Sequence, residues 1–115
     1  MNLLVPAECE SEISHSFFQK MINAMSLSFF KYGPIRLGYP KRVNAIASLK
    51  ARLEKYEKNG NTEYLVDIAN FAMIEFILPA HPNTNDNPSD SNESPGRIWN
   101  GEIEGVQDRN DLKSS

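Results

Sequence analysis

Hydrophobic and polar positions along the chain predict three helices, of which the last is the most apolar. Residues 62–78, TEYLVDIANFAMIEFIL, carry apolar side chains around most of a helical circumference and leave one narrow polar stripe of Glu63, Asp67 and Asn70. A helix with so little polar surface has to be covered on several sides. We therefore expect this helix to lie innermost in the fold.

Two amphipathic segments precede the apolar helix. In the first, apolar residues recur at intervals of four, three, four and three, and we expect this helix to start near Ser11 and to end before Gly33 and Pro34. Its predicted core-facing stripe is Phe18, Ile22, Met25, Phe29 and Tyr32, and Phe17, Met21 and Ala24 widen the stripe on its flank. The second helix is predicted over residues 41–58, with an apolar stripe of Val43, Ile46, Leu49, Leu53 and Tyr56.

Turn residues connect these helices and define the fold class. The segment 33–40, GPIRLGYP, predicts a shaped loop that folds back on itself, and residues 59–62, NGNT, supply a terminating glycine and a new cap within four positions. The second and third helices should therefore form a tight antiparallel hairpin. The sequence predicts an all-α protein with a three-helix core and an irregular C-terminal segment folded over it.

The composition changes after residue 78. Residues 79–99 form a segment rich in Pro, Asn and Ser that ends in SPGR and an apolar Ile98-Trp99 pair, and residues 100–115 form an acidic tail. We expect one helical domain over residues 1–78, a loop whose Trp99 anchors it to the helices, and a mobile tail. Residues 79–115 hold three Lys/Arg against seven Asp/Glu, whereas residues 1–78 hold nine against eight.

Cellular context is indicated only coarsely. The single cysteine, Cys9, excludes an intrachain disulfide, and the opening MNLLVPAE lacks the basic and long apolar regions of a secretory signal. No stretch approaches the roughly 20 apolar residues that a membrane-spanning helix needs. We expect a cytoplasmic protein without a membrane partner.

A basic segment provides the first candidate site. Residues 31–58 carry eight Lys/Arg against two Glu, and tyrosines stand among the first cations. Aromatic rings can stack on a base while cations meet phosphates, so this segment is suited to a nucleotide or a nucleic-acid strand. The alternative is an ordinary solvated basic face. The candidate binding residues are Lys31, Tyr32, Arg36, Tyr39, Lys41 and Arg42.

Four acids around the hairpin turn provide the second candidate site. Glu54 and Glu57 end the second helix, and Glu63 and Asp67 begin the third. Carboxylates from two adjacent helices suit a Mg²⁺ ion that engages a phosphate. The alternative is a set of surface ion pairs with neighbouring lysines, which the spacing favours.

Glu75 is the third candidate because it lies outside the polar stripe, in an apolar arc of its helix. We expect its carboxylate to be buried and paired with an arginine, either Arg97 of the SPGR turn or Arg52 of the second helix. Glu75, Arg97 and Trp99 are therefore candidates for ligand or partner contact.

Two resemblances bear on function. The Glu54-x-x-Glu57 pair followed by Glu63 and Asp67 is similar to the EExxE and ExxD pattern of MazG-type all-α nucleoside triphosphate pyrophosphohydrolases, although Leu53 stands at the first glutamate. That resemblance implies Mg²⁺-dependent nucleotide hydrolysis. The phrases GNTEYLVDIANFAMIEF and SPGR resemble small uncharacterised proteins of bacteria and their phages.

Together these features favour a small non-enzymatic binding or regulatory protein with no cofactor. The second resemblance implies a phage or mobile-element factor that acts on a host protein or defence component. Aromatic residues and methionines on a small fold also suit a homodimer. The alternative is a MazG-like pyrophosphohydrolase, or an inactive nucleotide-binding relative of that family.

Overall fold

The computed structural model describes residues 4–88, 98–99 and 102–103. Within them, the regular elements are η1 (Ala7–Glu12), α1 (His15–Tyr32), η2 (Ile35–Leu37), α2 (Ala45–Asn59), α3 (Glu63–Ile77), β1 (Ile98–Trp99) and β2 (Glu102–Ile103). The described residues up to 82 form one unit, which contains all the helices, and those from 83 onward belong to a second. The second unit contains β1 and β2, which pair antiparallel with Ile98 opposite Ile103. The predicted all-α class is confirmed for the helical unit.

Both of the first two α-helices begin later than the sequence pattern suggested. The Ser14 side chain accepts a hydrogen bond from the backbone N–H of Phe17 at 3.1 Å and caps α1, whereas the hydroxyl of Ser11 donates to the neighbouring Glu12 carboxylate. The Asn44 side chain accepts from the N–H of Ala47 at 2.9 Å and caps α2. The expected starts near residues 11 and 41 are therefore wrong, because better-placed capping side chains follow.

The predicted hairpin of α2 and α3 is present, and its turn depends on one glycine. Gly60 adopts the left-handed conformation with φ of 72°, and its N–H donates to the carbonyl of Tyr56 at 2.7 Å to close α2. The side chain of Asn61, rather than that of Thr62, then accepts from the N–H of Glu63 at 3.0 Å. Three residues therefore end one helix and begin the next.

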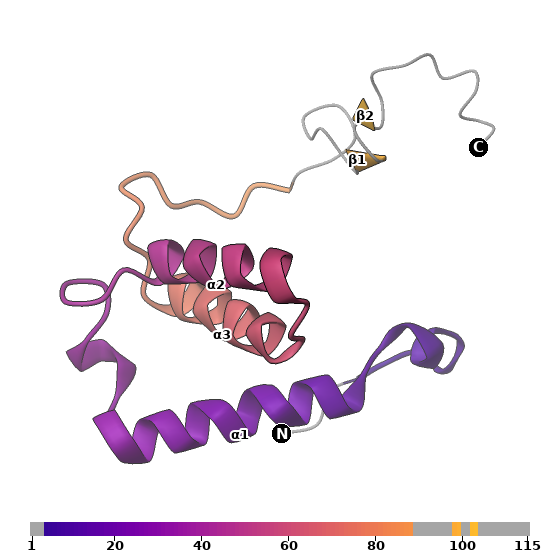
Figure 1. The fold of residues 1–115 in the computed structure, drawn as a ribbon, viewed down its shortest axis with the longest axis horizontal. Coiled ribbons are helices and arrows are strands. Elements are labelled where there is room, and N and C mark those ends of the chain that lie inside the picture. Colours follow the sequence, from indigo (N-terminus) through magenta and orange to yellow (C-terminus); the bar gives the residue numbers. More distant parts are fainter. Residues whose placement is uncertain (1–3, 89–97, 100–101, 104–115) are drawn as a thin grey trace. The chain divides into compact units, whose positions relative to one another are not determined.

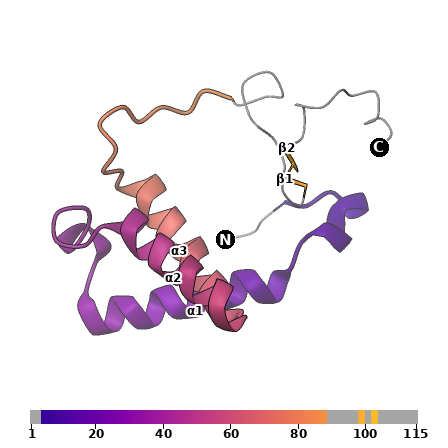
Figure 2. The same cartoon turned by 45° about the horizontal axis from the view of Figure 1, so that its top comes forward.

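Helix α3 lies between the other two helices, as Figure 1 shows, and α1 crosses the hairpin obliquely (Figure 2). Among the described residues, the buried ones are Val66, Asn70 and Ile74 on α3 and Ala45 on α2. The expectation that the third helix lies innermost is confirmed. None of the described helices is long and apolar enough to cross a membrane.

The face of α1 that packs on the hairpin is centred on the predicted flank of its apolar stripe. The half-buried residues of this helix are Phe17, Met21, Ala24, Met25 and Ser28. The flanking Phe17, Met21 and Ala24 and the central Met25 were predicted to face the core, whereas Ser28 was not. Phe18, Ile22, Phe29 and Tyr32 are 37%, 56%, 52% and 75% exposed. Because α1 is rotated in this way, most of its apolar stripe is left uncovered by the described residues.

We expect Gly60→Ala to lower the free energy of unfolding by about 1 kcal/mol, because a side chain rarely adopts φ of 72°. No heavy atom lies within 4 Å of the added methyl group, so the cost measures backbone strain alone. Urea denaturation followed by circular dichroism gives the value.

The matched control is Gly38→Ala. Gly38 has φ of −115°, and its added methyl group would lie 3.9 Å from Val43, an ordinary contact. This variant should unfold at the same urea concentration as the parent or slightly above it. Equal costs for the two variants would contradict the assigned role of Gly60.

Candidate functional site

The polar stripe of α3 makes side-chain contacts with both neighbouring helices. Each of its three members contacts a different residue of α1 or α2. The contacts join Glu63 Oε2 to Lys20 Nζ at 3.1 Å, Asp67 Oδ2 to Arg52 Nε at 3.2 Å and Asn70 Nδ2 to the carbonyl of Met21 at 3.2 Å. The first and third reach α1 and the second reaches α2, so one stripe orients both neighbours of α3.

Asn70 is the most buried member of the stripe and is only half satisfied. Its side chain is 6% exposed, and its Nδ2 group donates to the Met21 carbonyl, while no described residue donates to its Oδ1 atom. The orientation of the amide follows from the Met21 carbonyl, which accepts a hydrogen bond and cannot donate one. A buried carbonyl oxygen without a donor costs about 1 to 3 kcal/mol. Asn70 therefore has one hydrogen-bond acceptor that the described residues leave unused.

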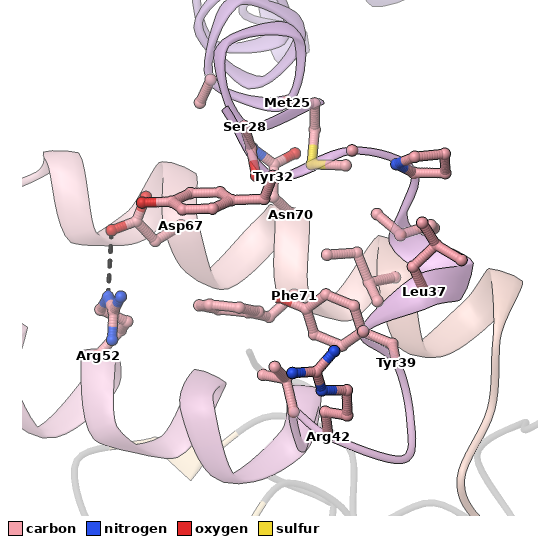
Figure 3. Close-up of a pocket in the computed structure, with 17 residues that line it drawn as sticks. Met25, Ser28, Tyr32, Leu37, Tyr39, Arg42, Arg52, Asp67, Asn70 and Phe71 are labelled. Atoms are coloured by element: carbon pink, nitrogen blue, oxygen red, sulfur yellow. Dashed lines mark hydrogen bonds and ion pairs between the residues drawn. The ribbon is translucent and has the colours of Figure 1, made fainter. Parts of the chain in front are cut away.

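A pocket of about 810 Å³ lies around Asn70, between α1, the η2 loop and the α2–α3 hairpin; we call it the α1–α3 pocket. This volume falls within the range of small-molecule sites in proteins. Figure 3 shows Met25, Ser28 and Tyr32 entering from the side of α1, and Tyr39 and Phe71 from the side of the loop and hairpin. The pocket is therefore walled mainly by aromatic and apolar side chains.

The η2 loop closes one end of the α1–α3 pocket because of its glycine and proline residues. Gly33 ends α1 with φ of 86°, its N–H donates to Phe29 O at 2.8 Å, and Pro34 then leads the chain into η2. Within the loop, the N–H groups of Gly38 and Tyr39 both donate to the carbonyl of Ile35. The Tyr39–Pro40 peptide bond is cis. The predicted shaped loop is confirmed.

Tyr39 and Phe71 present aromatic surface beside a cation. Burial raises the pKa of the Tyr39 phenol above its usual value of 10.0, and the nearby positive charge of Arg52 partly opposes that rise. The guanidinium of Arg52 lies 5.3 Å from the centre of the Phe71 ring and also forms the ion pair with Asp67. At neutral pH the phenol is uncharged, so it adds no negative charge beside the lining arginines.

Arg42 is the second cation of the pocket and differs from Arg52 in having no acidic partner. Among the described residues, no carboxylate lies within ion-pair distance of Arg42. Its side chain is exposed and lines the pocket near Tyr39 (Figure 3). Its guanidinium is available to an anion that enters from solvent.

The predicted basic site is therefore brought together in part. Tyr32, Tyr39 and Arg42 line one pocket. Lys31, Arg36 and Lys41 are exposed and do not line it, and Lys31 Nζ instead lies 5.8 Å from the centre of the neighbouring Tyr32 ring. The positions of cationic residues along a loop sequence do not show which of their side chains point into a pocket.

The four acids proposed for magnesium have separate surroundings. Glu54 and Glu57 border a shallow hollow formed by α2 alone, Glu63 pairs with Lys20, and Asp67 pairs with Arg52. Within the described part of the chain, no three His, Cys, Asp or Glu residues gather as metal ligands. Arg52 lies eight positions before Gly60 and Asp67 lies seven positions after it, so the two residues come close together across the hairpin.

Glu75 has a different environment from the one expected. Its side chain is half-exposed, and its Oε2 atom accepts a hydrogen bond from the backbone N–H of Ala80 at 2.9 Å, just beyond the end of α3. Arg52 pairs with Asp67 instead. The predicted burial and the Arg52 alternative are therefore wrong. Arg97 and the side chain of Trp99 lie outside the described residues.

Several residues that line the α1–α3 pocket were not among the candidates identified from the sequence. Met25 and Phe71 appeared as ordinary core residues, and Ser28 carried no signal. The one available indication was Asn70, an amide in the middle of the most apolar helix. Such a residue either faces water or has a specific partner when buried.

No protein-family model, curated protein or solved structure matches the chain. The two sequence resemblances therefore stay predictions. Functional inference has to come from the α1–α3 pocket and the surfaces around it.

Alkaline titration tests the environment of Tyr39. Because its pKa is raised in the folded state, the native protein holds this proton more tightly than the unfolded chain, and the associated stability is lost as pH rises above about 10. We expect Tyr39→Phe to reduce that loss and to remove the tyrosinate absorbance component of highest pKa. Tyr32→Phe should retain that component, and its disappearance there instead would show that Tyr39 is not the perturbed group.

Asn70→Leu tests whether the buried amide serves stability or binding. The substitution loses one hydrogen bond, worth about 1 kcal/mol, but removes an unsatisfied oxygen that costs about as much or more. We therefore expect a free energy of unfolding equal to or slightly above that of the parent in urea denaturation. A loss of more than about 2 kcal/mol would show that Asn70 is kept for stability.

Proposed function

We propose that this protein is a small non-enzymatic binding protein and that the α1–α3 pocket is its binding site. The observation that carries the proposal is the Oδ1 atom of Asn70, an acceptor that is buried beside a pocket of about 810 Å³ and receives no hydrogen bond from the described residues. This oxygen has an accessible area below 1 Å², so a ligand reaches it only after a small movement of the side chains around it. A hydrogen bond donated to it then offsets a cost already present in the free protein.

The lining residues favour a planar ligand with a hydrogen-bond donor at its edge. Tyr39 and Phe71 offer ring faces within the pocket, and Tyr32 offers a third near the solvent, where it is 75% exposed. Stacking of a base on an aromatic side chain contributes about 1 to 3 kcal/mol. A nucleobase with an exocyclic amino group provides both the planar ring and the hydrogen-bond donor.

Arg42 favours a ligand that also carries an anionic group. Its guanidinium has no ion-pair partner among the described residues and lies at the exposed side of the same pocket. Guanidinium groups bind phosphate through paired N–H donors. A nucleoside monophosphate with an amino-bearing base combines all three features.

Binding without catalysis is favoured by the roles of the polar lining groups. Of the residues that line the pocket, Asp67 is the carboxylate, and it is engaged by Arg52 at 3.2 Å. No histidine or cysteine lines the pocket, and Ser28 has no neighbouring base among the lining residues. The groups that can contact a ligand are therefore suited to bind it and are not arranged as a nucleophile with a general base.

Calorimetric titration with two nucleotides and one nucleoside tests the proposal. We expect AMP to bind more tightly than adenosine, which lacks the phosphate, and more tightly than purine riboside 5′-monophosphate, which lacks the amino group. Asn70→Leu should remove the preference for the amino group and leave the preference for phosphate. Equal affinities for the three compounds, or no heat with any of them, would reject the nucleotide as ligand.

Two charge-removing variants provide the matched comparison. Arg42→Gln should weaken AMP binding about tenfold, because a charge-assisted hydrogen bond contributes about 1.5 to 3 kcal/mol. Lys41→Gln removes the same charge from the preceding residue, which does not line the pocket, and should change the affinity less than threefold. If both variants weaken binding equally, the attraction is a general effect of net charge.

A further inference from the structure

We propose that this protein binds a single-stranded nucleic acid, with one base in the α1–α3 pocket and the adjoining phosphates on the cations around the opening of that pocket. Four residues in and beside the η2 loop supply these charges, and we call them the loop cations: Lys31, Arg36, Lys41 and Arg42. The inference rests on the proposed function, which places a base and one phosphate in the pocket. It adds the class of ligand, a strand in place of a free nucleotide.

The loop cations belong to a long stretch of sequence without acidic residues. Residues 13–53 contain seven Lys/Arg and no Asp/Glu, although the whole chain has a formal net charge of −3. This stretch includes all of α1, the η2 loop and the first half of α2. A concentration of positive charge on a protein that is negative as a whole favours a polyanion as partner.

The fold leaves the loop cations without acidic partners. All four are exposed, and no carboxylate of the described residues lies within ion-pair distance of any of them. Lys31 Nζ lies 5.8 Å from the centre of the Tyr32 ring, which is uncharged. By contrast, Arg52 of the same acid-free stretch is paired with Asp67. The loop cations are therefore available to phosphate groups that approach from solvent.

The loop cations lie next to the α1–α3 pocket. Arg42 lines the pocket itself, and Lys31, Arg36 and Lys41 are each adjacent in sequence to a lining residue. Their Cα atoms are thus about 3.8 Å from the Cα atom of a residue that borders the pocket. The end of α1, η2 and the loop that follows lie together at one end of the helical unit (Figures 1 and 2). A strand with one base in the pocket therefore brings its next phosphates to these cations.

Tyr32 provides a surface for a second base. It lines the pocket and is nevertheless 75% exposed, so its ring is accessible from solvent at the edge of the pocket. Stacking on an aromatic ring accepts any base, because every base has a π-face. Exposed rings beside cations that follow the backbone are typical of proteins that bind single strands.

A membrane with anionic headgroups is the other polyanion that these cations could attract. A lipid headgroup lacks the planar base that the aromatic walls of the pocket and the buried acceptor of Asn70 favour. The pocket and the loop cations are both used only when the ligand combines bases with successive phosphates. The observations therefore favour a nucleic-acid strand.

Fluorescence anisotropy with a labelled RNA heptamer tests the inference. The probe consists of uridylates with one central adenylate, which is its only base with an exocyclic amino group. At low salt this heptamer should bind at least tenfold more tightly than AMP, because it also reaches the loop cations outside the pocket. A heptamer with purine riboside at the centre, which lacks the amino group, should bind more weakly. Equal binding of the two heptamers would overturn the placement of a base in the pocket.

The salt dependence of heptamer binding measures how many phosphates are held. The logarithm of the binding constant falls by about 0.7 per logarithmic unit of salt for each neutralised phosphate of a single strand, so four loop cations predict a slope of about −2.8. Arg36→Gln/Lys41→Gln should reduce this slope by about 1.4 and weaken heptamer binding at least tenfold. The affinity for AMP should change less than threefold, because neither residue lines the pocket.

The matched control is Lys50→Gln/Lys58→Gln. It removes the same charge from exposed positions of α2 that neither line the α1–α3 pocket nor adjoin a lining residue, and it should change heptamer binding less than threefold. Equal weakening by the two double variants would show a general effect of net charge and would overturn the assignment of the loop cations.

The failure of this inference is distinguishable from the failure of the proposed function. If AMP binds and the heptamer binds no more tightly, the ligand is a free nucleotide and the strand is rejected. If AMP does not bind but the heptamer does, and its binding requires the loop cations and the central amino group, free AMP is rejected and the strand is upheld. If the heptamer does not bind and phosphatidylserine vesicles sediment with the protein, the loop cations bind a lipid surface and the strand is rejected.

Discussion

The arrangement of the helical unit depends on the polar stripe of α3. Glu63, Asp67 and Asn70 would ordinarily be expected to face water, yet they are the residues through which α3 holds α1 and α2. The ion pair of Glu63 with Lys20 is exposed, so it contributes little more than orientation. The buried amide of Asn70 is different, because a rotated α1 would leave both of its polar ends without partners.

That constraint explains both the α1–α3 pocket and the exposed apolar flank of α1. Because Lys20 and the Met21 carbonyl must face α3, α1 turns Phe17, Ala24 and Ser28 toward the hairpin and leaves Phe18, Ile22 and Phe29 partly in solvent. The same contact holds Asn70 beside the pocket with its carbonyl oxygen unused. The α1–α3 pocket and the exposed apolar flank of α1 are thus two results of one orientation of this helix.

The fold could be predicted from the sequence because its helices are separated by strong local signals. The apolar run of residues 62–78, the glycine at position 60 and the loop of residues 33–40 each determine the chain direction through nearby residues. The rotation of each helix could not be predicted in the same way. Periodicity identified the stripe that contains Ile22 and Phe29, but the contacts of Asn70 and Asp67, which join residues far apart in sequence, decided which side of α1 and α2 faces inward.

The candidate site was predictable to the same limited extent. Tyr32, Tyr39 and Arg42 were identified from a local mixture of rings and cations, and these three do line the pocket. Its most specific group, Asn70, was identified from the sequence only as a member of the polar stripe of an otherwise apolar helix. A single amide in an apolar helix deserves a functional hypothesis when one of its polar atoms has no partner after folding.

The most direct measurement is a nuclear Overhauser spectrum of the isotope-labelled free protein, recorded from the side-chain amide protons of Asn70. We expect contacts from these protons to the backbone of α1 around Met21, since Nδ2 donates to the Met21 carbonyl at 3.2 Å. We also expect slow exchange of the same protons with water, because the side chain is 6% exposed. Rapid exchange together with no contact to α1 would show that Asn70 faces solvent and does not orient α1.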